Sequence, residues 1–340
     1  MDKVESMPGI RKRGEEIRDF ILTHITECEN IAAVTSQHYG ISLQAVYKHI
    51  DRLVSSGQLA KKAGRYVLRS KQYKYMYRNN QELLEDAVWE QDIKKHFAGV
   101  PHNIYQIWTY GFLEMFNNAI EHSRGEKIRV MISENRMCTA LSVSDDGVGI
   151  FKNIKMKFRL FDEKDALLEL AKGKRTTDKT RHSGQGIFFT SKVFDDFTIT
   201  SNGITYNADP EKIMQTVKGK QKYATVVYMN LVNTSNKLLK NVFDTYSSEI
   251  PGDFDKTVVP VSLAHSNDLV SRSQARRILS GLELFRNVTL DFKGIDYIGQ
   301  AFADEIFRVF ATMNPHTVII AQNANVDVQS MINRAVHTKI

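Results

Sequence analysis

The feature that most constrains the fold of this chain is a polar pair inside a long segment of helical periodicity. From Asn103 to His122 apolar residues recur at helical spacing, and Glu114 and Asn118 are four residues apart within that segment. Residues four apart lie on one helix face, and polar groups on a packed face are costly unless they have partners. A metal ion with phosphates would supply partners, because an amide oxygen binds hard cations and a carboxylate can accept a proton from water. The helix alone fits such a site and an ordinary solvated face equally well.

Two glycine motifs follow this helix. The first, Asp145-Asp-Gly147-Val-Gly149, comes at the end of an expected strand. Its glycines allow another group to approach the backbone closely. The Asp145 carboxylate can accept a hydrogen bond from an amine. Taken alone, the motif also fits an ordinary Asp-Gly turn. The second, Gly184-Gln-Gly186, opens a helix, and free N–H groups at a helix N-terminus favour phosphate. The loop before it adds the basic residues Lys174, Arg175, Lys179 and Arg181.

The order of these motifs resembles the GHKL ATPase superfamily, which includes DNA gyrase, histidine kinases and the anti-sigma-factor kinases. The resemblance covers about 85–230 and includes a Thr-led closing strand, expected over 224–228. It implies a two-layer α/β sandwich that binds ATP and Mg²⁺. It also implies that Asn118 holds the metal, that Asp145 binds the adenine amino group and that Glu114 matches the general base of hydrolytic members. The other positions that it assigns to ATP are Gly147, Gly149, Ile150, Gly184, Gln185, Gly186 and Thr225.

The first 70 residues show a different pattern. Three helical stretches (11–25, 30–39 and 42–54) precede two short strands around a turn at Ala63 and Gly64. Residues 41–80 contain nine basic residues and one acidic residue, so their local charge of +8 exceeds the net charge of +7 of the whole chain. Such an excess favours a polyanionic partner, although a solvated basic surface has the same composition.

This pattern resembles the winged helix-turn-helix. The resemblance implies that double-stranded DNA is a partner, with an exposed helix face in the major groove and the wing on phosphates. Gln44 and Lys48 are the candidate base readers. The candidate phosphate contacts are Tyr47, Arg52, Lys61, Lys62 and Arg65. Winged helices also serve as protein-interaction modules, which remains an alternative.

In the last third of the chain, strands and helices alternate, which predicts an α/β layer. The segment 290–307 resembles a STAS-like domain, the fold of anti-sigma-factor antagonists, and this implies a protein partner. Those antagonists carry a phosphorylatable Ser where this chain has Gly299 and Gln300, so phosphorylation is not expected there. Asp304 and Glu305 are expected to be charges near a helix N-terminus rather than metal ligands.

Together these patterns predict a multidomain protein. The expected order is a winged helix (α+β) over 1–70, a connector over 71–100, a GHKL two-layer α/β sandwich over 101–235 and a STAS-like α/β domain over 250–340. No apolar run reaches the roughly 18 residues of a membrane span. The first residues lack the apolar core of a secretory signal, and the two cysteines have no disulfide or metal spacing, so a cytoplasmic protein is expected.

The predicted function is that of an ATP-binding transcription regulator whose DNA binding depends on nucleotide state. One alternative is an ATPase or protein Ser/Thr kinase of the anti-sigma-factor type, with Glu114 as general base. Another is a non-catalytic partner-switching protein that uses its domains for interactions. A homodimer is a further expected partner, since GHKL proteins and winged helices often act as dimers.

Overall fold

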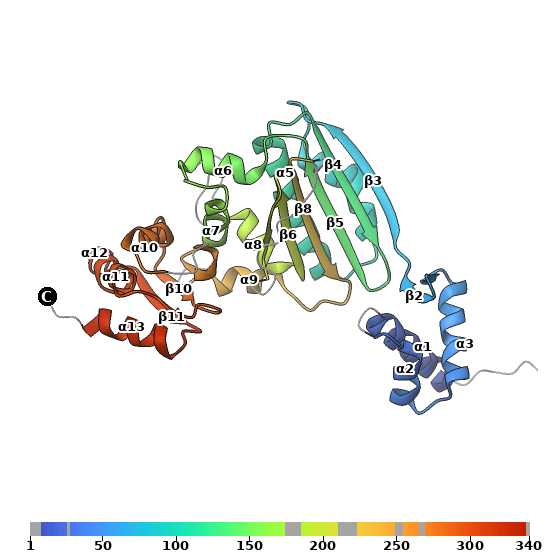
Figure 1. Ribbon diagram of the computed structural model, residues 1–340. Coiled ribbons are helices and arrows are strands. Elements are labelled where there is room, and N and C mark those ends of the chain that lie inside the picture. Colours follow the sequence, from blue (N-terminus) through green and yellow to red (C-terminus); the bar gives the residue numbers. More distant parts are fainter. Residues whose placement is uncertain are drawn as a thin grey trace, which may run out of the picture. The chain divides into compact units, whose positions relative to one another are not determined.

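The computed structural model describes residues 8–25, 28–173, 185–209, 223–248, 254–264 and 269–337 (Figure 1). Contacts between residues divide the chain into two compact units. The first unit consists of residues 1–74, 131–141 and 232–234, and the second consists of residues 75–130, 142–231 and 235–340.

The first unit begins with three helices, α1 (Pro8–His24), α2 (Ile31–Tyr39) and α3 (Leu43–Ser55). An antiparallel hairpin of β1 (Leu59–Lys62) and β2 (Arg65–Leu68) follows them. One apolar face from each helix and the start of β1 form a common core, which contains Ile17, Ile21, Leu22, Ile31, Val46, Ile50, Leu53 and Leu59. The predicted succession of three helices and a hairpin is confirmed.

Local signals define the ends of these elements. The side chains of Asn30 and Ser42 each accept a hydrogen bond from the backbone N–H three residues later, as N-caps do. Gly40 ends α2 in the left-handed conformation. Ala63 and Gly64 both have positive φ, which a tight two-residue hairpin turn requires. The predicted turn is therefore present, and local caps define the helix ends.

A six-stranded sheet forms the centre of the described chain, in the order β3-β4-β5-β8-β6-β7. Its strands are β3 (Lys71–Arg78), β4 (Lys127–Glu134), β5 (Cys138–Asp145), β6 (Asp196–Ser201), β7 (Ile204–Asn207) and β8 (Thr225–Val232). The strand expected to begin near Thr225 is present as β8, the last strand of this sheet in the sequence, and it lies between β5 and β6. Both of its neighbours therefore pair with it, and its alternate residues are buried.

Residues 71–78 were expected to belong to a connector, but β3 is the edge strand of this sheet. Its alternating tyrosines are half-buried, and each hydroxyl has a partner on a neighbouring element. Tyr73 bonds to Glu134, Tyr75 to His96 and Tyr77 to Asp92. This arrangement satisfies the polar tips of aromatic side chains that pack against the sheet.

Helices cover one face of the sheet (Figure 1). They include α5 (His102–His122) and α8 (Gly186–Val193), while α6 (Ile150–Phe158) and α7 (Asp165–Lys172) pack against one another and α9 (Leu239–Thr245) packs against α5 and α8. Between β3 and α5, within the expected connector, the chain forms α4 (Glu85–Val88), a π-helical turn η1 (Trp89–Ile93) and a 3₁₀ turn η2 (Lys94–Phe97). Stacked aromatic residues, among them Trp89, Phe97, Trp108 and Phe112, fill the space around α5.

The C-terminal domain contains a three-stranded parallel sheet in the order β11-β10-β9. Its strands are β9 (Lys256–Pro260), β10 (Asn287–Asp291) and β11 (Val318–Gln322). Its helical segments are η4 (Val261–Ala264), α10 (Arg272–Leu279), η5 (Leu282–Leu284), α11 (Gln300–Asp304), η6 (Glu305–Phe310), α12 (Ala311–Met313) and α13 (Val326–His337). Parallel strands joined through helices confirm the predicted α/β layer.

Candidate functional site

A pocket lies where α5, α6 and α8 meet the ends of β5 and β8. Four of the predicted ATP residues line it: Asn118 from α5, Asp145 from β5, Ile150 from α6 and Thr225 from β8. The remaining lining residues are Met115, Ala119, His122, Ser123, Val143, Asn153, Ile187 and Val227. The fold thus brings together polar groups that are up to 107 positions apart in the sequence.

Asp145 is the central polar group of this pocket. It is the last residue of β5 and only 5% exposed. Burial raises the pKa of its carboxyl, while hydrogen bonds from the Gly147 N–H (3.0 Å) and the Thr225 hydroxyl oppose that rise in pKa. The Thr225 hydroxyl oxygen also accepts the Ile150 N–H at 3.2 Å. A fixed, buried carboxylate beside a hydroxyl is suited to bind an amine that enters the pocket.

The two glycines after Asp145 allow the turn to approach its neighbours closely. A Cβ atom on Gly147 would collide with the backbone carbonyl of Ser123, at the end of α5. Gly149 has φ of +89°, and a Cβ atom there would collide with the side chains of Ser201 and Asn202. The motif therefore needs glycine at both positions because the turn is packed between α5 and the β6–β7 connection.

Glu114 lies one helical turn before Asn118 and does not line the pocket. It contacts instead the first residue of α8, since a Cβ atom on Gly186 would overlap the Glu114 carboxylate. Burial raises the pKa of the nearby Tyr110 hydroxyl, and the charge of Glu114 raises this pKa further. The predicted base therefore lies beside the second glycine motif, where Gln185 and Gly186 begin α8.

Four predicted site residues, Lys174, Arg175, Arg181 and Gly184, lie outside the described residues. Conversely, the pocket contains residues that the sequence patterns did not predict. His122 is four residues after Asn118, so its helix position was a usable signal. Asn153 follows Gly149 by one turn of α6 and donates a hydrogen bond to the His122 carbonyl at 3.3 Å. The helix α6 itself was not predicted.

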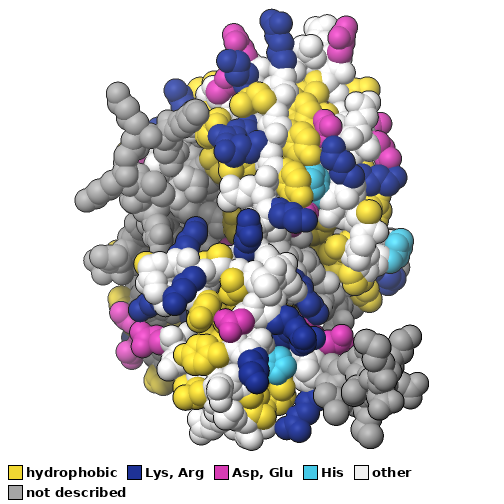
Figure 2. All heavy atoms as spheres, turned by 90° about the vertical axis from the view of Figure 1, so that its right-hand side faces the viewer, with side chains coloured by type: hydrophobic (Ala, Val, Ile, Leu, Met, Phe, Trp, Pro, Cys, Tyr) yellow, Lys and Arg dark blue, Asp and Glu magenta, His cyan; other side chains and the backbone are white. Residues whose placement is uncertain are grey.

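The residues predicted to bind DNA share exposed positions in the first unit. Gln44, Tyr47, Lys48 and Arg52 lie on the face of α3 opposite its buried residues Val46, Ile50 and Leu53. Lys61, Lys62 and Arg65 are exposed on the β1–β2 hairpin. Lys and Arg are the commoner charged side chains on the face of the molecule in Figure 2.

A local positive field accompanies the α3 surface. Burial lowers the pKa of His49 on α3, and the charges of Arg18 and Arg52 lower it further. Like charges disfavour a protonated imidazole, so Arg18 and Arg52 place two positive charges near His49. The surface is suited to an anionic partner.

The turn between β4 and β5 packs on the helical core of the first unit. Arg136 at this turn forms an ion pair with Asp19 of α1 (2.7 Å) and donates to the Gln58 side chain (3.2 Å). Met137 packs against the core formed by α1, α2 and α3. From this turn, β5 runs from Cys138 to Asp145, which lines the pocket.

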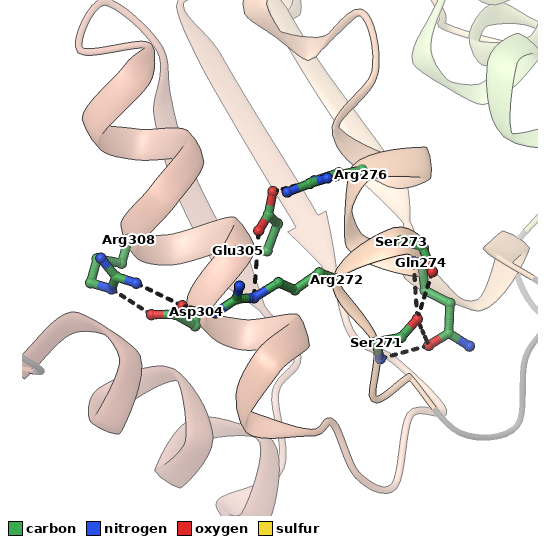
Figure 3. A network of polar contacts seen from close by, with 8 residues as sticks. All are labelled: Ser271, Arg272, Ser273, Gln274, Arg276, Asp304, Glu305 and Arg308. Carbon is green, nitrogen blue, oxygen red and sulfur yellow. Dashed lines mark hydrogen bonds and ion pairs between the residues drawn. The ribbon is translucent and has the colours of Figure 1, made fainter.

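Asp304 and Glu305 take part in a network of ion pairs in the C-terminal domain (Figure 3). Asp304 pairs with Arg308 and lies 3.5 Å from Arg272. The buried Glu305 accepts a hydrogen bond from Arg276 at 2.6 Å. Asp304 therefore contacts one arginine of η6 and one of α10, whereas Glu305 contacts arginines of α10, and the two carboxylates connect α10 with α11 and η6. Within the described ranges, no three His, Cys, Asp or Glu side chains cluster as a metal site.

The family described as STAS-like domain of unknown function (DUF4325) matches residues 274–329. The match includes β10, β11 and the helices between them, so the predicted STAS-like character of the C-terminal domain is confirmed. No curated protein matches the chain.

Among the described helices, none combines the length and apolar character needed to cross a lipid bilayer.

Proposed function

We propose that this protein is an ATP-binding transcription regulator whose affinity for duplex DNA depends on its nucleotide state. The observation that carries the proposal is the pocket in which Asn118, Asp145 and Thr225 converge from one helix and two strands. This is the arrangement that the resemblance to GHKL ATPases implies for ATP. In the proposal, the first unit is a winged helix and the central sheet with its helices is the GHKL fold.

The residues of the pocket fit a bound adenine nucleotide. The Asp145 carboxylate accepts a hydrogen bond from the adenine amino group, and the Gly147 N–H, which donates to the same carboxylate, holds it in place. The polar lining also fits Mg²⁺ held by Asn118 together with nucleotide phosphates. Mg²⁺ commonly retains several waters and binds one or two protein ligands plus phosphates, so it needs no cluster of protein carboxylates.

Strand β5 supports a link between nucleotide and DNA. Its last residue, Asp145, lines the pocket, and the turn before its first residue holds the helical core through Arg136 and Met137. A nucleotide that binds more tightly when β5 occupies one of two positions increases the fraction of the protein that has β5 in that position. The proposed regulation therefore needs no contact between nucleotide and DNA.

DNA affinity measured with and without nucleotide tests this proposal. Binding of the full chain to labelled random duplex DNA is followed by fluorescence anisotropy across a salt series, with Mg²⁺ and a non-hydrolysable ATP analogue present or absent. We expect the Kd for DNA to change about 5- to 150-fold, the usual range of coupling between two sites. Equal affinity in both states would reject nucleotide control. If the analogue binds but DNA does not bind even at low salt, a partner-switching protein is favoured.

The position of Glu114 favours a second candidate, ATP hydrolysis or phosphoryl transfer. The carboxylate lies against Gly186, so it is adjacent to the α8 N-terminus, where phosphates are expected. Replacing it by the isosteric amide in Glu114→Gln removes the base and should lower turnover at least about 100-fold, with ATP binding retained. The matched control is Glu82→Gln, which makes the same change at an exposed carboxylate outside the pocket. Unchanged turnover in Glu114→Gln would reject this role.

A further inference from the structure

Helix α7 connects the central sheet domain to the C-terminal domain. Six of its eight residues are buried: Ala166, Leu167, Leu168, Glu169, Ala171 and Lys172. It packs against β9 and η4 of the C-terminal domain and against α6 and α8 of the central domain. A short helix buried on most of its surface depends for its position on the elements around it.

Lys172 at the end of α7 makes the most specific of these contacts. Its side chain is 2% exposed, and its ammonium group donates to Glu169 (2.9 Å) and to the backbone carbonyls of Arg277 (3.1 Å) and Ser280 (2.9 Å). Three acceptors match the three protons of an ammonium group. In return, the Thr257 hydroxyl of β9 donates to the Lys172 carbonyl at 3.0 Å. Lys172 thus binds two segments of the C-terminal domain through geometry that a smaller side chain cannot reproduce.

A second group of contacts joins α8 to the same domain. Phe188 and Phe189 of α8 lie with their rings 4.7 Å and 5.0 Å from the ring of Phe254, next to β9. Phe254 in turn contacts Phe285, which precedes β10, at 5.3 Å. Phe188 also packs directly against Gly173, the residue after Lys172. The contacts of α7 and α8 with the C-terminal domain therefore form one continuous set.

The helix α8 also forms one side of the pocket. Its first residue, Gly186, contacts Glu114, and its second residue, Ile187, lines the pocket next to Asn118 and Thr225. Any displacement of α8 therefore changes the pocket, and the position of α8 depends on the C-terminal domain through Phe188, Phe189 and α7.

We propose that the C-terminal STAS-like domain sets the nucleotide affinity of the pocket within the same chain, with Lys172 as the positioning residue. This inference rests on the proposed binding of ATP. A signal or partner protein that loosens the domain from α7 and α8 weakens nucleotide binding. By linkage, bound nucleotide tightens the contact between the domain and these helices by the same factor. The domain then controls the nucleotide affinity of its own chain, and a partner protein changes that affinity by binding to the domain.

The test compares wild type, Lys172→Met and a control variant as full-length chains. Lys172→Met keeps the length of the side chain and removes its three donors. Because it also leaves Glu169 buried without its cation, the double variant Glu169→Leu with Lys172→Met is measured beside it, so that a folded protein without the contact is available. The control is Arg308→Met, which breaks an ion pair with Asp304 inside the C-terminal domain (Figure 3).

Two measurements are made on each variant. The first is the Kd for a fluorescent, non-hydrolysable ATP analogue with Mg²⁺, and the second is backbone hydrogen exchange in α8 without nucleotide. We expect both Lys172 variants to bind the analogue at least about tenfold more weakly and to exchange faster in α8, and Arg308→Met to behave as wild type. An unchanged Kd in both Lys172 variants overturns the proposal.

The exchange measurement separates this proposal from the proposed function. If wild type does not bind the analogue, the proposed function has failed, and control of nucleotide affinity fails with it. Faster exchange in α8 of the Lys172 variants then still supports the claim that the C-terminal domain positions α8. Exchange equal to that of wild type and Arg308→Met overturns that claim as well.

Discussion

The variant Asp145→Asn is expected to bind ATP about 100-fold more weakly than wild type, while its nucleotide-free form melts at a higher temperature. The loss of affinity follows from the hydrogen bonds of the carboxylate. One side-chain oxygen must still accept the Gly147 N–H, so the new amide NH₂ faces the adenine amino group, and two donors meet. A hydrogen bond to a charged group contributes about 1.5–3 kcal/mol, and an unsatisfied donor adds to the loss.

The gain in stability follows from the sign of the pKa shift. Burial raises the pKa of Asp145 in the folded protein. A carboxyl of this kind contributes most to stability below its unfolded pKa of about 3.9, and that contribution is lost as the pH rises through the raised folded value. At neutral pH the buried charge therefore lowers the free energy of unfolding, and a neutral Asn removes this cost. Thermal denaturation across pH measures the difference between the two proteins.

The neighbouring residue supplies the control for Asp145→Asn. Asp146 is exposed, and its carboxylate accepts the backbone N–H groups of Glu126 and Lys127 outside the pocket. Asp146→Asn changes the same charge one residue away and should leave ATP affinity unchanged. Equal ATP affinity in Asp145→Asn and wild type would remove the adenine role from Asp145.

The ATP affinity of wild type should also fall on acidification through the pKa of Asp145, and that pH dependence should be absent from the Asn variant.

The parts of the fold that local sequence predicts well are those whose interactions are local. The caps at Asn30 and Ser42 bond to N–H groups three residues away, so the residue types alone indicate the helix starts. The β6–β7 hairpin has a signal of the same kind. Asn202 and Gly203 have φ of +50° and +84° between alternating strands, as the Asn-Gly dipeptide predicts for a tight hairpin turn.

The candidate site was predictable in a different way. Asn118, Asp145 and Thr225 were placed in one site from the order of motifs, and the structure brings them to one pocket. Asn153 was missed because it lies on the nine-residue helix α6, whose start depends on the packed turn at Gly149. Short helices that tertiary packing stabilises have weak signals of their own.

Lys172 shows where local prediction fails for a physical reason. A lysine in a helix normally predicts a solvated position. This one is buried because carbonyl groups 105 and 108 residues away accept hydrogen bonds from its ammonium group. Nothing near Lys172 in the sequence indicates those acceptors, so the connection between the two domains could be found only in the folded structure.

The largest effect on DNA binding is expected from the β1–β2 hairpin. The variant Lys61→Gln, Lys62→Gln, Arg65→Gln removes three exposed cations that the proposed winged helix places on phosphates. Each phosphate contact contributes about 0.9 to the slope of log K against log salt, so this slope should decrease in magnitude by about 2.7. The same relation gives a loss of affinity on the order of several hundred-fold at about 0.1 M salt. Fluorescence anisotropy across a salt series measures both quantities.

A control with the same change of charge separates phosphate contacts from net charge. Lys94, Lys95 and Lys240 are exposed in the second unit, and their replacement by Gln also removes three cations. That control should retain a slope close to wild type, because long-range attraction between separated charges is screened beyond about 10 Å at 0.1 M salt. If both triple variants lose slope equally, the hairpin makes no specific phosphate contacts. Loss of slope in the hairpin variant alone, with its ATP affinity unchanged, would place the DNA surface on the first unit and leave the pocket as an independent site that regulates it.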